Sequence, residues 1–296
     1  MPTETIIAAK KADAGSVETL PDKGFYWREQ GHLKMLVCEA LEAAGFANGF
    51  STRLGGVSPM PENDLNLAGF DDDTAENIQA NRALFLSLFP DNYTLSTAWQ
   101  VHGSDLKDVD SMDAADRTDE KFDALISRLP GILLGVKTAD CVPVLIGDRT
   151  RGVFSAVHAG WRGTAAGIVQ NAVKAMQSTY GSDPADLIAA IGPSACGRDY
   201  EIGKDVIQMF EANFSNAASY LTETRPGHAL IDLDLVNRDQ LTSIGVTDQN
   251  IYTSSLCTLE RTDLFFSYRR EKARLGKTGR LLSVIGMLSG PSPDAG

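Results

Sequence analysis

The sequence predicts an α/β (α+β) sandwich, a single domain in which mixed β-sheets are flanked by helices. Short runs of apolar and β-branched residues alternate along the chain with segments that have the apolar period of a helix. No linker rich in Pro, Gly and Ser interrupts this alternation. The 296 residues, 43% of them hydrophobic, are enough for one large core. Strands and helices in this alternation pack as sheets covered by helices.

Five segments have the apolar spacing of helices. In the first of them Leu33, Val37 and Leu41 fall on one helical face, and Gly45 marks its end. Another begins near Thr164, directly after a glycine-rich turn. The predicted helices cover residues 32–44, 72–88, 164–180, 204–214 and 234–244.

Strands are predicted where short apolar or β-branched runs lie between turn signals. The first of these leads into the Gly55–Gly56 pair, and a buried-type strand ends at Gly192–Pro193. A turn over residues 138–141 separates two neighbouring β-rich runs. The predicted strands cover residues 50–54, 131–136, 142–146, 153–157, 187–191, 251–256 and 280–287.

Both ends of the chain are polar and predicted to be tails. Residues 1–22 form the N-terminal tail, residues 23–289 the domain and residues 290–296 the C-terminal tail. Within the domain, residues 105–123 are rich in Asp and poor in apolar side chains, which predicts a solvated loop. A cation-binding loop is the less favoured interpretation, because these acids match no EF-hand spacing.

Composition excludes several classes of function. The net charge of −12 argues against a nucleic-acid binder, although it leaves room for a local positive pocket. No apolar run approaches the roughly 18 residues of a membrane span. The four cysteines are widely spaced and form no CxxC pair, and no signal peptide is evident. We therefore expect no disulfide framework and a reducing cytoplasmic location. The expected assembly is a monomer or small homo-oligomer, which no sequence feature decides.

Three short segments contain the residues that indicate chemistry. They are residues 100–103 (QVHG), 138–143 (TADCVP) and 157–164 (VHAGWRGT). His102, Cys141 and His158 within them each lie at the end of a predicted strand, where α/β sheets present functional side chains. Zinc takes these ligand types, and three protein ligands leave a fourth position open. The separations are too long for a zinc finger, so the pattern predicts a catalytic metal site.

Each of these residues also has a simpler interpretation. A cysteine between apolar residues, such as Cys141, is commonly a small core residue. A lone histidine is commonly a hydrogen-bonded polar residue, and Gly-Trp-Arg-Gly can be a capping turn. Against this, a strand–turn–helix unit near His158 would place helix N–H groups and Arg162 together, which attracts an anion such as phosphate. Asp140 could orient the neighbouring Cys141.

The three segments QVHG, TADCVPVLI and VHAGWRGTAAGIV resemble the signature segments of the laccase-domain, or multicopper polyphenol oxidase-like, family, whose members are described as purine nucleoside phosphorylases. The resemblance covers residues 24–289 and includes further motifs: FSTRLGGVS, LNL, NR, IGP, YEIG, FFSYRR and TGR. It implies a single-domain α/β sandwich. It also implies a metal, usually zinc and less favourably copper, bound by His102, Cys141 and His158.

The implied reaction is phosphorolysis of inosine or adenosine, with methylthioadenosine as a further candidate. Some members of the family are also described as deaminating adenosine. Placing phosphate requires cations, and the candidates are Arg53, Arg162 and Arg269. A zinc deaminase also needs a proton shuttle. No H-x-E motif is present, so Asp140 is the nearest candidate. Phe70, Trp99 and Tyr200 are candidates for stacking on the purine.

Three alternatives stay open. Cys141 paired with His158 or His102 could form a metal-free cysteine hydrolase. A laccase-like polyphenol oxidase is disfavoured, because four histidines in the whole chain cannot build several His-rich copper sites. A metal-buffering or interaction module is disfavoured, because a protein that only stores metal needs no arginines beside three dispersed ligands.

Overall fold

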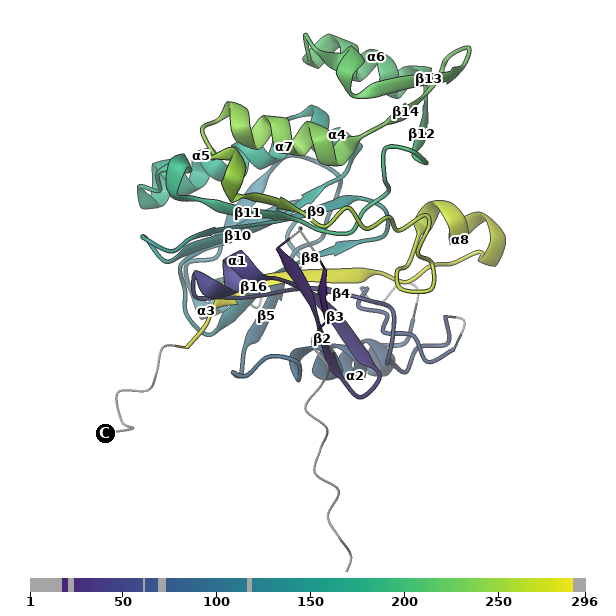
Figure 1. Cartoon of the computed structure of the whole chain (residues 1–296). Helices are drawn as coiled ribbons and strands as arrows, with labels where there is room; N and C mark the ends of the chain where they lie inside the picture. Colours follow the sequence, from purple (N-terminus) through teal and green to yellow (C-terminus); the bar gives the residue numbers. More distant parts are fainter. Residues whose placement is uncertain (1–17, 21–23, 61, 69–72, 116–118, 290–296) are drawn as a thin grey trace, which may run out of the picture.

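Two β-sheets stacked face to face form the centre of the computed structural model, and helices cover their outer faces (Figure 1). The structure describes residues 18–20, 24–60, 62–68, 73–115 and 119–289. The predicted α+β class, with mixed sheets flanked by helices, is confirmed. Residues 1–17 and 21–22 of the predicted N-terminal tail and the whole predicted C-terminal tail, residues 290–296, lie outside the described residues.

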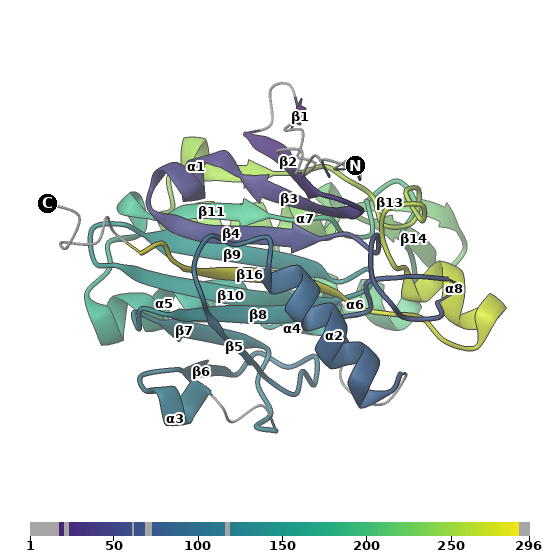
Figure 2. The ribbon, with the colours of Figure 1, turned by 90° about the horizontal axis from the view of Figure 1, so that it is seen from below.

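One sheet has seven strands, and β16 from the end of the chain lies near its middle. All neighbours in it are antiparallel apart from β5 and β8. In order across the sheet the strands are β1 (Glu18–Leu20), β2 (Phe25–Gln30), β3 (Leu33–Cys38), β4 (Phe46–Ser51), β16 (Leu281–Met287), β8 (Ile132–Thr138) and β5 (Thr94–Thr97). Helix α2 (Ala75–Leu86) covers the outer face, where Phe85 packs with Met35 and Val284 (Figure 2).

The second sheet has six strands, of which β9 and β10 form a long antiparallel pair. In order its strands are β15 (Ile251–Thr253), β11 (Ile188–Ile191), β9 (Val142–Asp148), β10 (Val153–Ala159), β7 (Ala124–Ser127) and β6 (Leu106–Asp108). Its outer face is covered by α4 (Trp161–Ala165), α5 (Ile168–Tyr180) and α7 (Leu233–Ser243) (Figure 1). Helix α5 buries Val169, Val173 and Met176 there, which are spaced as one helical face.

The core between the two sheets is aromatic and aliphatic. Phe46 of β4 and Phe154 of β10 meet edge to face with ring centroids 6.3 Å apart. Gly147 of β9 makes room for this packing, because a Cβ atom there would lie 2.6 Å from the Phe46 ring. The two sheets are therefore held together near the start of β10, and the predicted site lies at the opposite end of the β9–β10 pair.

A smaller unit lies at one side of the sandwich. Its three-stranded sheet has the order β12 (Glu201–Gly203), β14 (His228–Ile231) and β13 (Leu221–Arg225) and packs with α6 (Lys204–Asn213). The remaining α-helices are α1 (Glu39–Ala43), α3 (Met112–Ala115) and α8 (Tyr268–Leu275). Short 3-10 helices cover Pro184–Asp186, Ala217–Ser219 and Asp248–Asn250. None of the helices in the described part of the chain is long and apolar enough to cross a membrane.

The predicted helix over residues 32–44 is wrong for its first half. Residues 33–38 form strand β3, which pairs with β2 through the turn at Gly31 and His32, and only Glu39–Ala43 is helical. Strand β3 is buried on both faces, so its apolar residues do not alternate. A strand of this kind cannot be told from a helix by periodicity.

Other differences are smaller. The predicted helix over 164–180 is two helices, α4 and α5, because Gly167 between them has a left-handed backbone (φ 73°). The predicted strand 50–54 is observed earlier in the chain, as β4. Residues 18–20 of the predicted tail pair with β2 as strand β1. Residues 105–123 contain β6 and α3, with 116–118 outside the described residues. The other predicted helices and strands are confirmed with shifted bounds.

The cysteines also differ from expectation. No disulfide framework was expected, but Cys196 and Cys257 form a disulfide that links two loops 61 residues apart in sequence. Cys38 and Cys141 are free. Wide spacing in the sequence did not reveal this pair, because two distant loops become neighbours only in the folded sheet.

The inter-sheet core generates a stability prediction. Phe154→Ala should lower the free energy of unfolding by about 3–5 kcal/mol, because the cavity between rigid sheets cannot collapse. Met209→Ala, at an exposed position of α6, is the matched control and should change it little. Urea unfolding followed by circular dichroism measures both. An equal effect of the two substitutions would contradict this description of the core.

Candidate metal centre and adjoining cavity

Three strand ends bring the predicted ligands together. Cys141 lies in the turn between β8 and β9, and His158 lies at the end of β10 opposite Pro143. His102 comes from the loop after β5. One ligand atom from each of the three side chains lies within 4.8 Å of the other two. The sequence prediction that these dispersed residues converge is therefore supported by the geometry.

A glycine makes this convergence possible. A Cβ atom at Gly160 would lie 3.1 Å from His102 Cδ2 and 3.2 Å from Cys141 Sγ, closer than ordinary contacts. The two imidazole rings meet edge to face with centroids 4.9 Å apart. Gly160 therefore has a packing role, in addition to preceding helix α4.

Asp123, directly before β7, connects the parts of this cluster. Its buried carboxylate accepts hydrogen bonds from the backbone N–H groups of Val101 (3.2 Å), His102 (2.9 Å) and Gly103 (2.7 Å). Its Oδ1 also lies 2.7 Å from His158 Nδ1. The sequence analysis missed this residue by including it in an Asp-rich loop. The only available signal was its position directly before the apolar run Ala124–Ser127.

Two of the site residues have left-handed backbones. His102 has φ 61° and Asp140 has φ 85°, and neither is glycine. Such a conformation costs on the order of 1–3 kcal/mol and persists only where the surroundings enforce it. The bonds to Asp123 enforce it at His102, and those made by the Asp140 carboxylate enforce it at Asp140.

The electrostatics of the cluster favour a thiolate. Burial raises the pKa of the Cys141 thiol, but His158 and His102 outweigh burial and bring that pKa down to about 6. Burial lowers the pKa of His158, but Cys141 and Asp123 outweigh burial and raise that pKa to about 9. Burial raises the pKa of Asp123, but the hydrogen bonds with His158 and with the backbone outweigh burial and hold that pKa below its usual value.

The donor set fits a metal ion of the zinc type. One thiolate and two imidazoles are borderline-soft ligands, and three of them leave a position open. His158 uses Nδ1 for the Asp123 carboxylate, so Nε2 is the nitrogen that would face an ion. A carboxylate behind a metal-binding histidine is the usual supporting contact in such centres. The same two-His, one-Cys set also suits copper, so the donors alone do not choose the metal.

A cavity of about 750 Å³ opens beside the cluster. Its volume is within the usual range for small-molecule sites. Arg162 and Arg269, two of the predicted phosphate-binding residues, line it, and so do Trp99 and Tyr200, two of the predicted stacking residues. Phe70, the third predicted stacking residue, lies outside the described residues. Three further basic residues line the cavity: Arg82, Lys137 and Arg280. The sequence analysis placed Arg82 and Arg280 in the NR and TGR motifs but assigned them no role, and it did not single out Lys137.

Arg53 differs from its predicted role. It is not among the residues that line this cavity, and its side chain is buried in ion pairs with Asp64 and Glu271. It also donates to the backbone carbonyls of Met60 and Thr262. All these partners are internal, so Arg53 has a structural setting and a phosphate-binding role finds no support here.

Asp140 lines the cavity, but its carboxylate is held by the protein. Oδ1 accepts from the Thr258 hydroxyl and Oδ2 from the backbone N–H of Arg269, each at 2.7 Å. Burial raises the Asp140 pKa above its usual value, although both hydrogen bonds favour the charged form. The residue therefore fixes the start of α8 beside Cys141.

The family described as multi-copper polyphenol oxidoreductase laccase matches residues 47–288. A protein of Streptomyces coelicolor named purine nucleoside phosphorylase is 40% identical over 238 residues, which cover 80% of this chain and 93% of that protein. One of the same name from Deinococcus radiodurans is 39% identical over 241 residues, covering 80% of this chain and 88% of that protein. The crystal structure of YlmD from Geobacillus stearothermophilus has a TM-score of 0.81 and 32% identity, covering 90% of this chain and all of that one.

The setting of Arg53 generates a prediction that separates structure from substrate binding. Arg53→Met should lower the free energy of unfolding by about 3–5 kcal/mol, because it leaves Asp64 and Glu271 buried without their cation. Arg261→Ala breaks only an exposed pair with Asp263 and should cost about 0–1 kcal/mol. Urea unfolding measures both. Unchanged stability of Arg53→Met would show that this account of Arg53 is wrong.

The contacts of Asp123 generate a second prediction. Asp123→Asn should weaken zinc binding by about 10–100-fold, because an amide cannot serve three N–H donors and an imidazole as a carboxylate does. Competition with a chromophoric chelator measures the affinity. Asp105→Asn, at an exposed position nearby, should leave it unchanged. Equal affinities of Asp123→Asn and the wild type would refute the supporting role of this carboxylate.

The Cys141 pKa generates a third prediction. Protein treated with a chelator but not reduced should be alkylated at Cys141. Cys38 is buried and its pKa is raised to about 11, and the other two cysteines are joined in a disulfide. The thiolate fraction should rise through pH 6, so the rate should be half-maximal near pH 6 rather than near the usual ~8.5. Iodoacetamide kinetics against pH measure this, with Cys141→Ser as the blank. An inflection near pH 8.5 would contradict it.

Proposed function

We propose that this chain, which belongs to the family described as multi-copper polyphenol oxidoreductase laccase, is a metal-dependent purine nucleoside phosphorylase. The observation that carries the proposal is a three-ligand cluster opening onto a cavity lined by cations and aromatic rings. Relatives at 39–40% identity that are named purine nucleoside phosphorylases support the same activity.

The cavity suits the two substrates of this reaction. Its volume of about 750 Å³ accommodates a nucleoside and a phosphate ion. Trp99 and Tyr200 line the cavity and are the proposed aromatic contacts of the purine; the Arg269 guanidinium lies over one face of Tyr200, 4.9 Å from the ring centroid. Arg162 and Arg269 would hold phosphate through charge-assisted hydrogen bonds and orient it toward the anomeric carbon of the sugar. Inosine and adenosine are the proposed nucleosides, and methylthioadenosine is a further candidate.

His102, Cys141 and His158 would hold the metal, which we propose to be zinc. When bound, such an ion would supply a Lewis acid and lower the pKa of a water molecule beside the substrate. Asp123 keeps the His158 ring in one orientation and one tautomer, with Nδ1 toward the carboxylate. Its bonds to the 101–103 backbone keep His102 in place.

The departing purine needs a proton or a hydrogen-bond donor. Asp140 is the proposed group, since it lines the cavity beside Cys141. To contact the purine, its carboxyl would exchange one of its two hydrogen bonds, with the Thr258 hydroxyl or with the Arg269 N–H. The same residue is the proposed shuttle for deamination of adenosine, if the enzyme catalyses it. A polyphenol oxidase reaction is not proposed, because four histidines cannot supply several copper sites.

One observation favours a second candidate, a cysteine hydrolase. Cys141, His158 and Asp123 have the arrangement of a nucleophile, a base and an orienting carboxylate. The pKa values near 6 for Cys141 and near 9 for His158 describe a thiolate–imidazolium pair. A hydrolase of this kind would stay active after complete metal removal, whereas the proposed phosphorylase would not.

Phosphate dependence tests the proposed reaction. With inosine and phosphate the protein should release hypoxanthine and ribose 1-phosphate in equal amounts. Without phosphate no hypoxanthine should appear, because phosphate is the nucleophile. Chromatography of the bases and an enzymatic assay of the sugar phosphate measure both products. Hypoxanthine release at the same rate without phosphate would replace the phosphorylase with a hydrolase.

The proposed phosphate site generates a further prediction. Arg269→Ala should raise the KM for phosphate by about 10–100-fold, the equivalent of one charge-assisted hydrogen bond. The fold should survive, because the bond to Asp140 uses the Arg269 backbone. Arg261→Ala, on the exposed surface, is the matched control. An unchanged KM for phosphate in Arg269→Ala would exclude this residue from the phosphate site.

A further inference from the structure

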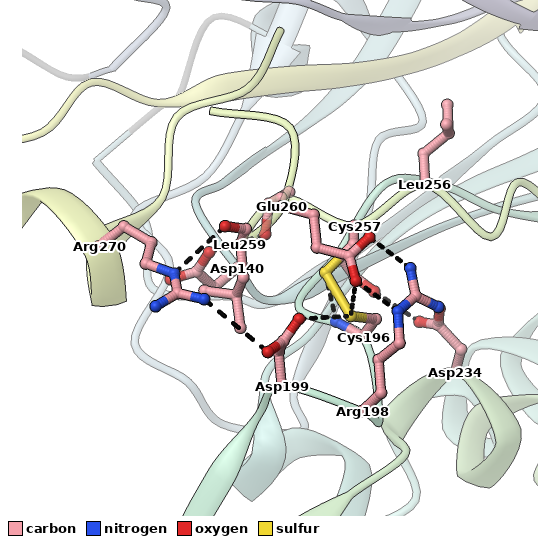
Figure 3. The surroundings of a disulfide bond; sticks show 12 residues. Asp140, Cys196, Arg198, Asp199, Asp234, Leu256, Cys257, Leu259, Glu260 and Arg270 are labelled. Carbon is pink, nitrogen blue, oxygen red and sulfur yellow. Dashed lines mark hydrogen bonds and ion pairs between the residues drawn. A yellow bond between two sulfur atoms is a disulfide. The ribbon is translucent and has the colours of Figure 1, made fainter. Parts of the chain in front are cut away.

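A second group of metal-type ligands lies outside the proposed centre. It contains Cys196, Asp199, Cys257 and Glu260, and one ligand atom from each lies within 4.8 Å of the others (Figure 3). These residues come from two loops, one between β11 and β12 and one between β15 and α8. We call them the Cys196 cluster.

The two loops contribute ligands with the same spacing. Cys196 and Asp199 are three positions apart, and so are Cys257 and Glu260. In each loop a tight turn follows the cysteine: Asp199 N–H donates to Cys196 O at 3.0 Å, and Arg261 N–H donates to Cys257 O at 3.0 Å. Paired ligands separated by two residues on tight turns are typical of structural zinc sites.

The backbone holds the loops together independently of the disulfide. Ser194 N–H donates to Leu256 O at 3.2 Å, and Thr258 N–H donates to Ser194 O at 2.8 Å. These bonds form a parallel β-bridge between Ser194 and Cys257. Cys196 N–H also donates to Cys257 Sγ at 3.3 Å. The two sulfur atoms therefore stay neighbours when the bond between them is reduced.

The two carboxylates face the sulfur atoms. Asp199 Oδ2 lies 3.7 Å and Glu260 Oε1 4.0 Å from Cys196 Sγ (Figure 3). A neutral disulfide gains little from two nearby anions, and two anions oppose the formation of thiolates. A divalent cation among them would satisfy all four donors. Arg198 donates to both oxygens of Glu260, so an ion that takes Oε1 would leave Arg198 on Oε2. Arg270 lies 3.8 Å from Asp199.

We propose that the reduced Cys196 cluster binds a divalent ion of the zinc type through all four side chains. A dithiol or phosphine reductant first gives two electrons to the disulfide, and each sulfur takes up a proton. The ion then displaces the two thiol protons and binds two thiolates and two carboxylates. Four protein ligands make this a closed, structural site, unlike the open centre at His102. In a reducing compartment the metal-binding form would prevail.

The site would stabilise the loops that hold Asp140. Ala195, beside Cys196, donates its N–H to Asp140 O at 2.9 Å. Thr258, beside Cys257, donates its hydroxyl to Asp140 Oδ1 at 2.7 Å. An ion that binds both Cys196 and Cys257 would therefore restrict the motion of Ala195 and Thr258, the two donors that hold Asp140. Because binding to the folded state alone stabilises a protein, it should also raise the melting temperature.

The experiment uses the full chain carrying Cys141→Ser, so that the first centre lacks a ligand. The protein is reduced with a phosphine, incubated with zinc and desalted, and zinc per chain is measured by mass spectrometry. We expect about one zinc per chain after reduction, and none in the oxidised protein or in reduced Cys141→Ser/Cys257→Ser. The melting temperature should rise with zinc only in the reduced parent.

A second variant tests the site without removing a cysteine, in case the cysteine variant does not fold. Asp199→Asn/Glu260→Gln keeps both sulfurs, and in the Cys141→Ser background its reduced form should bind zinc at least tenfold more weakly. Asp263→Asn, an exposed acid of the same loop, is the matched control and should bind zinc as its parent does. Two freely titrating thiols at Cys196 and Cys257 with no bound zinc would overturn the proposal. So would unchanged zinc affinity in the double carboxylate variant.

Discussion

The proposed metal centre depends on one buried carboxylate, that of Asp123. A buried charge must be compensated by hydrogen bonds, and Asp123 obtains them from three backbone N–H groups and one imidazole. These donors belong to the His102 loop and to strand β10. Satisfying Asp123 therefore fixes both histidines relative to each other and enforces the left-handed backbone at His102.

The two stacked sheets supply the frame in which this constraint acts. Cys141 and His158 lie at one end of the β9–β10 pair, whose antiparallel register runs from Val153 opposite Asp148 to Ala159 opposite Val142. Gly160 lets the ligands approach closely. Arg269 at the start of α8 and Tyr200 directly before β12 line the cavity, so these residues come from other elements than the three ligands.

The fold class, most helices and the convergence of the three ligands could be predicted from the sequence, because periodicity and strand-end position are local signals. Strand β3 could not, since burial on both faces removes the alternation that marks a strand. Asp123 and the Cys196–Cys257 pair depend on which distant segments meet. The ion pairs of Arg53 could not be predicted for the same reason. Asp64 and Glu271, its buried partners, lie outside the motif around Arg53, and that motif does not indicate them.

The central claim is that a single ion at His102, Cys141 and His158 is required for phosphorolysis. Its most direct test adds zinc stepwise to chelator-treated, oxidised protein while phosphate-dependent release of hypoxanthine from inosine is followed. The account predicts no activity without metal, and a linear rise that ends at about one zinc per chain. Full activity in the metal-free protein would contradict it and favour a reaction carried by the Cys141 thiolate.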